Sequence, residues 1–184
     1  MPSDADLLAI ARDLAVEAGA LAVRRRREGV SVAATKSSPV DVVTETDREV
    51  EAFIRARLAE LRPGDGFFGE ESDAAESRSG LTWVVDPIDG TVNFLYDIPA
   101  WAVSIGVVEG APDPATWTAI AGCVVNPVLG EVFTAVRGQG AFLGDERIQV
   151  SGATDLALSL VGTGFAYSAE TRRIQAAVVT DLIG

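Results

Sequence analysis

Apolar residues recur at helical spacing in two stretches near the start of the chain. The first stretch has Leu7, Ile10, Ala11, Leu14, Ala18 and Leu21 on one face. It predicts a helix over about 4–27, with Ser3 and Asp6 nearby as a capping start. The second has Val50, Phe53, Ile54, Leu58 and Leu61 on one face, and predicts a helix from about 46 to 61 that stops at Arg62-Pro63-Gly64. Residues 30–43, between the helices, are typical of strand and turn, with a bend at 36–39.

From residue 66 the pattern becomes that of short strands joined by turns. Apolar and β-branched runs predict strands at 81–85, 102–108, 119–125 and 131–136, and residues 66–69 have the same character. Pro87 cannot continue the strand before it. Residues 126–130 are a hairpin signal, and 137–140 and 144–145 mark further tight turns. Strands connected this way favour an antiparallel sheet with the two helices packed on one face, an α+β fold.

Composition narrows the possible chemistry. The chain has no histidine and one cysteine, which excludes Ser-His and Cys-His nucleophiles and the usual zinc sites. Any metal must therefore be held by oxygen, which points to magnesium, manganese or calcium. Cys123 cannot form an internal disulfide, which fits a reducing cytoplasm.

Charge and hydropathy narrow the possible partners. The net charge of −12 argues against nucleic acid, and the basic run at 24–27 complements the end of a helix dipole. No apolar run is long enough to cross a membrane, and the N-terminus lacks the pattern of a secretory signal.

Three pairs of acidic residues lie at or near the ends of the predicted elements. They are Asp41 with Asp47, Glu70 with Glu71, and Asp86 with Asp89. Each pair has a structural alternative: Asp47 as a helix N-cap, 69–72 as a solvated turn, and 86–90 as a turn that Asp and Gly favour in any case. The third pair follows a buried strand and precedes Thr91 and Asn93, which can start a short helix. Carboxylates gather hard cations and free N–H groups gather phosphate, so this point predicts metal and phosphate binding.

The order and intervals of these clusters resemble the inositol monophosphatase family. The residues that carry the resemblance are DVVTETD at 41–47, GEES at 69–72, WVVDPIDGTVNF at 83–94, PAWAVSIG at 99–106 and AVRGQGAF at 135–142. The resemblance covers about 36–165, and the DPIDGT element is highly specific. It implies a layered αβαβα sugar-phosphatase fold and a Mg²⁺-dependent, lithium-sensitive, dimeric phosphatase that uses two or three ions, with Mn²⁺ as a possible substitute.

The same resemblance implies roles for individual residues. Glu70, Asp86 and the carbonyl of Ile88 would bind the first ion, and Asp86 would bridge to a second ion that Asp89 also holds. Gly90 and Thr91 would direct backbone N–H groups at the phosphate. The substrate would thus contact Glu70, Ile88, Asp89, Gly90 and Thr91. The Thr91 hydroxyl, bonded to Asp47, would help Glu70 position and deprotonate the attacking water. Lys36 would lie on a loop near the site, with a solvated loop lysine as the equal alternative.

The C-terminal part departs from the family pattern. Residues 156–164 predict a buried strand that opens a second unit, and 169–183 predict a helix. The Trp-Asp-x-Ala-Ala-Gly element, whose Asp completes the second metal site in the family, has no match after Phe165. We therefore expect an N-terminal α+β metal- and phosphate-binding domain at 1–151 and the beginning of a C-terminal α/β domain at 152–184, with the rest missing.

The expected function is hydrolysis of a small polyol phosphate, with inositol monophosphate favoured by the residues flanking the motifs. Two metals suit this reaction because a single general base supplies only about 10²–10⁴-fold of the acceleration that phosphate esters need. Histidinol-phosphate, fructose-bisphosphate and phosphoadenosine-phosphate phosphatases remain alternatives, as does a catalytically idle metal- or partner-binding module. The 184-residue chain alone is expected to show little turnover.

Overall fold

Both N-terminal helices form, and both begin with a capping box. The computed structural model describes residues 2–35, 42–110 and 113–183. Helix α1 (Asp4–Glu28) is capped by Ser3, as predicted. Helix α2 (Glu45–Leu61) begins slightly earlier than predicted, because Thr44 is its N-cap and Asp47 its third residue. The Asp47 carboxylate accepts the Thr44 N–H at 2.9 Å, which fixes the start of the helix.

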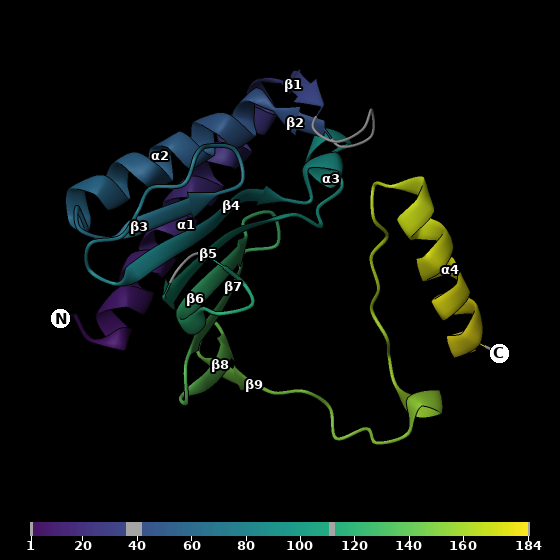
Figure 1. Cartoon of the computed structure of the whole chain (residues 1–184). Coiled ribbons are helices and arrows are strands. Elements are labelled where there is room, and N and C mark those ends of the chain that lie inside the picture. The colour runs from purple at the N-terminus through teal and green to yellow at the C-terminus, as the bar shows by residue number, and fades with distance from the viewer. Residues whose placement is uncertain (1, 36–41, 111–112, 184) are drawn as a thin grey trace.

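The strands form one seven-stranded sheet and a separate hairpin-like pair (Figure 1). In sheet order the seven are β3 (Gly66–Gly69), β4 (Leu81–Asp89), β5 (Ala102–Glu109), β6 (Thr118–Asn126), β7 (Glu131–Val136), β8 (Gly140–Leu143) and β9 (Glu146–Ile148). Strand β1 (Val32–Thr35) pairs with β2 (Val42–Thr44). The expected antiparallel sheet is correct from β4 to β9, but β3 runs parallel to β4. The connection 70–80 makes this possible, since it returns the chain to the end of the sheet at which β3 began.

Strand β4 runs through Pro87 to Asp89, so the prediction that it stops at Val85 is wrong. Its pairing with β5 becomes irregular between Asp86, opposite Ser104, and Asp89, opposite Ala102. An irregularity of this kind leaves backbone groups outside the ladder, which is where a strand tolerates proline. The short helix α3 (Thr91–Leu95) follows directly.

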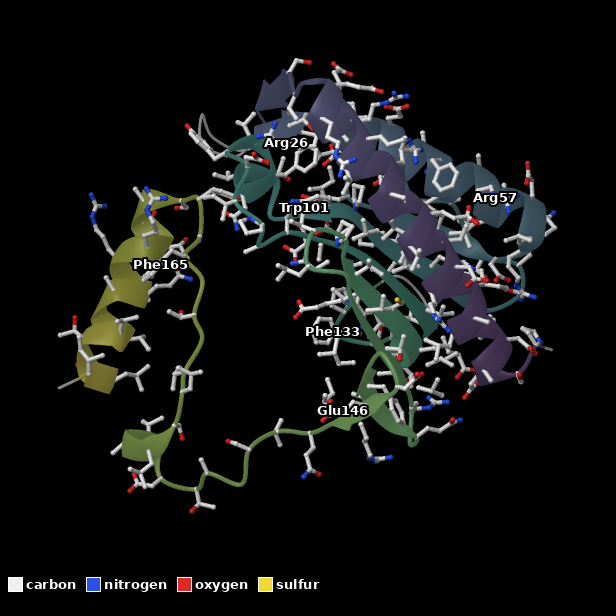
Figure 2. All side chains as sticks on the ribbon, turned by 180° about the vertical axis from the view of Figure 1, so that it is seen from behind. Arg26, Arg57, Trp101, Phe133, Glu146 and Phe165 are labelled. Carbon is white, nitrogen blue, oxygen red and sulfur yellow. The ribbon has the colours of Figure 1, made fainter. Side chains whose placement is uncertain are left out.

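The core lies between the sheet and the two helices, which cover one face of it (Figure 2). Strand β5 shows the alternation expected of such a sheet. Val103, Ile105 and Val107 are buried, whereas Ser104 and Gly106 between them are only half-buried. The helices contribute Leu7, Leu14 and Ile54 to the same core, so the predicted apolar faces of both helices are buried, except that Leu61 at the end of α2 is exposed.

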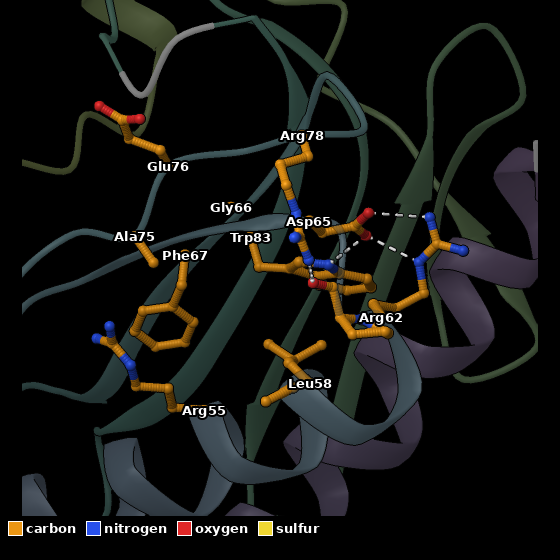
Figure 3. A pocket seen from close by; sticks show the side chains of 12 residues that line it. Arg55, Leu58, Arg62, Asp65, Gly66, Phe67, Ala75, Glu76, Arg78 and Trp83 are labelled. Carbon is orange, nitrogen blue, oxygen red and sulfur yellow. Dashed lines mark hydrogen bonds and ion pairs between the residues drawn. The ribbon is translucent and has the colours of Figure 1, made fainter.

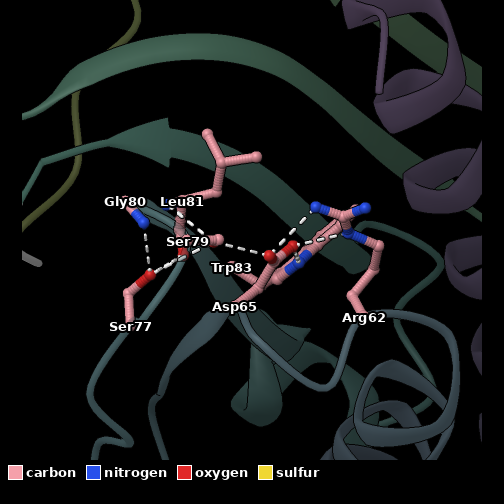
Figure 4. A network of polar contacts seen from close by, with 7 residues as sticks. All are labelled: Arg62, Asp65, Ser77, Ser79, Gly80, Leu81 and Trp83. Carbon is pink, nitrogen blue, oxygen red and sulfur yellow. Dashed lines mark hydrogen bonds and ion pairs between the residues drawn. The ribbon is translucent and has the colours of Figure 1, made fainter. Parts of the chain in front are cut away.

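A buried aspartate joins the end of α2 to the sheet (Figure 4). The Asp65 carboxylate accepts two hydrogen bonds from Arg62, at 2.8 and 3.0 Å, one from the Trp83 indole at 2.9 Å and one from the Ser79 hydroxyl at 2.6 Å. Burial alone would raise the pKa of Asp65, but the hydrogen bonds from Arg62, Ser79 and Trp83 outweigh it and hold the pKa below its usual value.

The C-terminal segment forms a helix but no strand. Helix α4 (Ala169–Ile183) agrees with the prediction, whereas 156–164 contain only a short 3₁₀ turn at Leu156–Leu158 and are almost entirely exposed. The predicted buried strand is therefore wrong here. A strand needs a neighbour to pair with, and the part of the chain that the structure describes offers none at this position. Figure 1 shows α4 apart from the sheet. The division into two domains at 151 stays a prediction.

Candidate active site

Three chain segments meet at one end of the sheet: the start of α2, the loop after β3, and the turn from β4 into α3. Asp47 on α2 is only 1% exposed. Its Oδ1 accepts the Thr91 hydroxyl at 3.0 Å, and its Oδ2 accepts both the N–H and the hydroxyl of Thr44. Burial raises the pKa of Asp47, and the hydrogen bonds from Thr44 and Thr91 oppose that rise. The structure thus brings together two of the predicted site residues, Asp47 and Thr91.

Glu70 and Asp86 come together because of the parallel pairing of β3 and β4. Gly69 lies opposite Val85, so the residues that follow each of them, Glu70 and Asp86, emerge at the same edge of the sheet. Burial, followed by the charge of Glu70 and a hydrogen bond shared with it, raises the pKa of Asp86 to about 8. Asp89 adds to the repulsion, and the Ile88 N–H opposes it by donating to Asp86 at 3.1 Å.

The turn that carries Ile88 and Gly90 has a fixed geometry. Gly90 has φ 94°, a left-handed backbone, and a Cβ there would lie 3.1 Å from the carbonyl oxygen of Ala100, so only glycine fits without strain. The Thr91 hydroxyl is 3.1 Å from the Ile88 carbonyl oxygen as well as 3.0 Å from Asp47. A hydroxyl has one proton to donate, so Asp47 and Ile88 compete for it.

The start of α3 differs from the prediction. The sequence favoured Thr91 or Asn93 as its polar cap, but Gly90 is the N-cap and no side chain caps the helix. Thr91 is directed at Asp47 and Ile88, and the Asn93 amide donates instead to the Ala100 carbonyl at 2.7 Å. The backbone N–H groups at the start of α3 therefore have no side-chain cap and can donate to other partners.

The donor set is one that a hard cation prefers. Glu70, Asp86, Asp89 and the Ile88 carbonyl offer oxygen atoms only, as Mg²⁺ requires. Among the described residues, however, no three Asp, Glu, Cys or His side chains are gathered closely enough to hold a metal ion. Burial and the negative charge of Glu70 disfavour the ionised form of Asp86 and raise its pKa to about 8. A cation beside Asp86 would favour the ionised carboxylate, and in this sense the residues fit the metal.

Two predicted residues cannot be placed, and two contacts were missed. Lys36 and Asp41 lie outside the described residues. Glu51 and Arg55 were not predicted as site residues, although both bind the loop that carries Glu70. Asp47, Glu51 and Arg55 follow one another at intervals of four residues along α2, and this spacing is the one signal that could have found them.

A separate cavity of about 480 Å³ lies at the far end of α2 (Figure 3). It is lined mainly by Arg55, Leu58, Arg62, Phe67, Arg78 and Trp83. The predicted site residues are absent from its lining. The predicted site residues that the structure describes therefore lie at the strand ends and not at this cavity.

No helix in the described ranges 2–35, 42–110 and 113–183 combines the length and apolar character needed to cross a bilayer.

Along nearly its whole length the chain is similar to several known proteins. The model of the Inositol monophosphatase family matches residues 3–182. Inositol-1-monophosphatase SuhB of Mycobacterium tuberculosis is 42% identical over 97% of this chain and 66% of its own length. The crystal structure of extragenic suppressor protein suhB from Bartonella henselae, 32% identical, has a TM-score of 0.85 over 97% of this chain and 67% of that one. SaIMPase-II with bound inositol monophosphate is 25% identical, with a TM-score of 0.74 over 97% and 64%. The chain spans about two thirds of the length of these relatives.

Proposed function

The chain belongs to the inositol monophosphatase family, and from this premise we propose that the protein hydrolyses a small phosphate monoester, with inositol monophosphate as the substrate. The observation that carries the proposal is the close approach of Glu70 and Asp86, whose mutual repulsion a cation would relieve. A relative solved with inositol monophosphate bound supports the choice of substrate.

In this proposal Glu70, Asp86, Asp89 and the Ile88 carbonyl hold two or three Mg²⁺ ions, for which Mn²⁺ can substitute. When bound, such ions acidify water and neutralise the charge on the attacking and leaving oxygens. The Thr91 hydroxyl donates its proton to Asp47 at 3.0 Å, so its oxygen would accept a hydrogen bond from the attacking water. Thr91 and Glu70 would together orient and deprotonate this water. The N–H groups of Gly90 and Thr91 bind the phosphate. Lys36 is proposed as a loop contact to the substrate.

Other esters and one other class of function remain as alternatives. Histidinol-phosphate, fructose-bisphosphate and phosphoadenosine-phosphate are the competing substrates, because the residues that would select the leaving group are not among those matched to the family motifs. A catalytically idle metal- or partner-binding module is the alternative from a different class. The net charge of −12 speaks against nucleic acid as a partner.

The test is phosphate release by the full-length protein from these four esters. We expect release that requires Mg²⁺, is fastest with inositol monophosphate and is lost in Asp89→Asn. A preference for another ester would replace the proposed substrate. Equal rates of phosphate release with Mg²⁺, without Mg²⁺ and in Asp89→Asn would rule out the proposed enzyme. The catalytically idle module would then be the remaining alternative.

Three further expectations belong to the proposal. Lithium inhibits by occupying a magnesium position, the protein is a homodimer, and it acts in the cytoplasm, where the lone Cys123 stays reduced. Inhibition in the millimolar range and sedimentation at twice the monomer mass are the corresponding measurements.

A further inference from the structure

One face of α2 carries Asp47, Glu51 and Arg55, spaced four residues apart. Residues at this spacing share a helix face, and all three side chains contact the loops that carry the candidate site. Asp47 accepts the Thr91 hydroxyl. One turn further along the helix, Glu51 Oε2 accepts the backbone N–H of Glu71 at 2.7 Å. A further turn along, Arg55 donates to the loop again.

Glu51 holds the backbone on both sides of Glu70. It is 2% exposed, which is rare for a carboxylate unless it has partners. Glu71, which follows Glu70, donates its N–H to Glu51. Gly69, which precedes Glu70, lies so close that a Cβ atom there would overlap the Glu51 carboxylate and come within 2.6 Å of the Phe67 ring. The lack of a side chain at Gly69 therefore lets the loop lie against Glu51.

Arg55 holds the next part of the same loop. Its guanidinium donates to the Ser72 hydroxyl and to the Asp73 carbonyl, each at 2.7 Å. The guanidinium also lies over the Phe67 ring, 4.8 Å from its centre, and Figure 3 shows the two side chains together. Stacking on an aromatic face fixes the plane of a guanidinium and hence the direction of its N–H groups.

We propose that Glu51 and Arg55 are positioning residues, which hold the loop so that Glu70 stays beside Asp86 and is ready to bind a cation. The inference rests on the proposed function, since it assigns these residues to the metal site. Two nearby carboxylates repel each other, and a free loop would turn Glu70 away into water. The contacts from α2 prevent this, and the same helix holds Thr91 through Asp47.

The test compares Glu51→Ala, Glu51→Gln and Arg55→Ala in the full-length protein. Glu60→Ala is the matched control, because Glu60 is also on α2 but its side chain is 68% exposed. Isothermal titration with Mg²⁺ should show the dissociation constant rising roughly 10–100-fold in Glu51→Ala, the range found when partners of metal ligands are removed. We expect about 3–10-fold in Arg55→Ala. Glu51→Gln keeps an acceptor oxygen for the Glu71 N–H and should restore most of the affinity.

Amide hydrogen exchange without metal provides a second measurement. The segment 69–73 should exchange faster in Glu51→Ala and Arg55→Ala than in the wild type, and at the wild-type rate in Glu60→Ala.

Unchanged Mg²⁺ affinity in folded Glu51→Ala overturns the inference. If Glu51→Ala does not fold, unchanged affinity in Arg55→Ala overturns it, because that side chain is only half-buried and its removal leaves the core intact. A wild type that binds no Mg²⁺ overturns the proposed function as well. A wild type that binds Mg²⁺, next to variants that bind it equally well, overturns this inference alone.

Discussion

Two acidic residues flank strand β3, and each lies in a different environment beside β4. Asp65 precedes β3 and is surrounded by donors from Arg62, Trp83 and Ser79. Glu70 follows β3 and meets Asp86, a second acid, at the other end of the same strand pair. Burial acts on both Asp65 and Asp86, yet the pKa of Asp65 is lowered and that of Asp86 is raised to about 8.

Burial raises the pKa at both acids, but the hydrogen bonds from Arg62, Ser79 and Trp83 outweigh it at Asp65, whereas the charge of Glu70 adds to it at Asp86. An acid whose oxygens are all satisfied by the protein stabilises the fold and has nothing left to offer a ligand. Two acidic side chains that face each other lower the stability of the folded state until a cation binds beside them. In the proposed function, the two ends of one short strand thus separate a structural carboxylate from a functional one.

The largest expected effect is on catalysis at the functional end. Asp86→Asn should lower phosphate release by about 10³-fold or more, because cation stabilisation of several kcal/mol is lost. Asp65→Asn, at the structural end, should release phosphate at nearly the wild-type rate. The measurement is the steady-state rate at saturating Mg²⁺. An Asp86→Asn protein that keeps a tenth of the activity would remove the distinction between the two ends.

The next effect is on stability at the structural end. Asp65→Ala should lower the free energy of unfolding by about 3 kcal/mol, since the half-buried Arg62 guanidinium and the Trp83 N–H both lose their acceptor. Urea unfolding measures this. Asp65→Asn should lose less, because its amide oxygen still accepts. In Asp86→Asn, without metal and near pH 8, stability should stay the same or rise. A loss there as large as in Asp65→Ala would contradict the comparison.

The smallest effect, taken per pH unit, is a pH dependence of opposite sign at the two ends. For Asp86 the folded pKa is about 8 and the unfolded value about 3.8, so between these values the unfolded chain binds fewer protons. Its contribution to stability is present below about pH 4 and lost as the pH rises through about 8, by at most about 1.4 kcal/mol per pH unit. For Asp65 the folded pKa is lowered, so its contribution is present above about pH 4 and lost in acid.

Urea unfolding from pH 3 to 9 in a chelator measures both contributions. Asp86→Asn should flatten the decline between pH 4 and 8, and Asp65→Asn should flatten the loss in acid. Profiles that match the wild type in both variants would show that other groups set the pH dependence.

Local pattern predicted the parts of the fold that depend on local interactions. The helices follow from apolar spacing and from capping residues such as Ser3, and the β6–β7 hairpin follows from the turn at 126–130. The parallel pairing of β3 with β4 could not be predicted this way, because no periodicity encodes which strands become neighbours. The strand expected at 156–164 failed for a related reason: an apolar run specifies burial but not the surface that provides it.

The candidate site shows the same limit. The order of the acidic clusters led to Asp47, Glu70 and Asp86, and the expected hydrogen bond between Thr91 and Asp47 is present. The roles assigned to these residues stay predictions. Glu51 and Arg55 escaped notice because a charged residue on a helix is usually solvated. Only the fold reveals that one turns inward to a loop backbone and that the other stacks on Phe67.

The side-by-side alignment of β3 and β4 also has a consequence for folding kinetics. The β3–β4 pairing joins residues that are farther apart in the sequence than those joined within a helix or by the β6–β7 hairpin, and more distant pairings form more slowly. Glu70 and Asp86 face each other only after Gly69 has aligned with Val85. The capacity to capture a divalent ion should therefore emerge late during refolding, after the helices and the β6–β7 hairpin have formed.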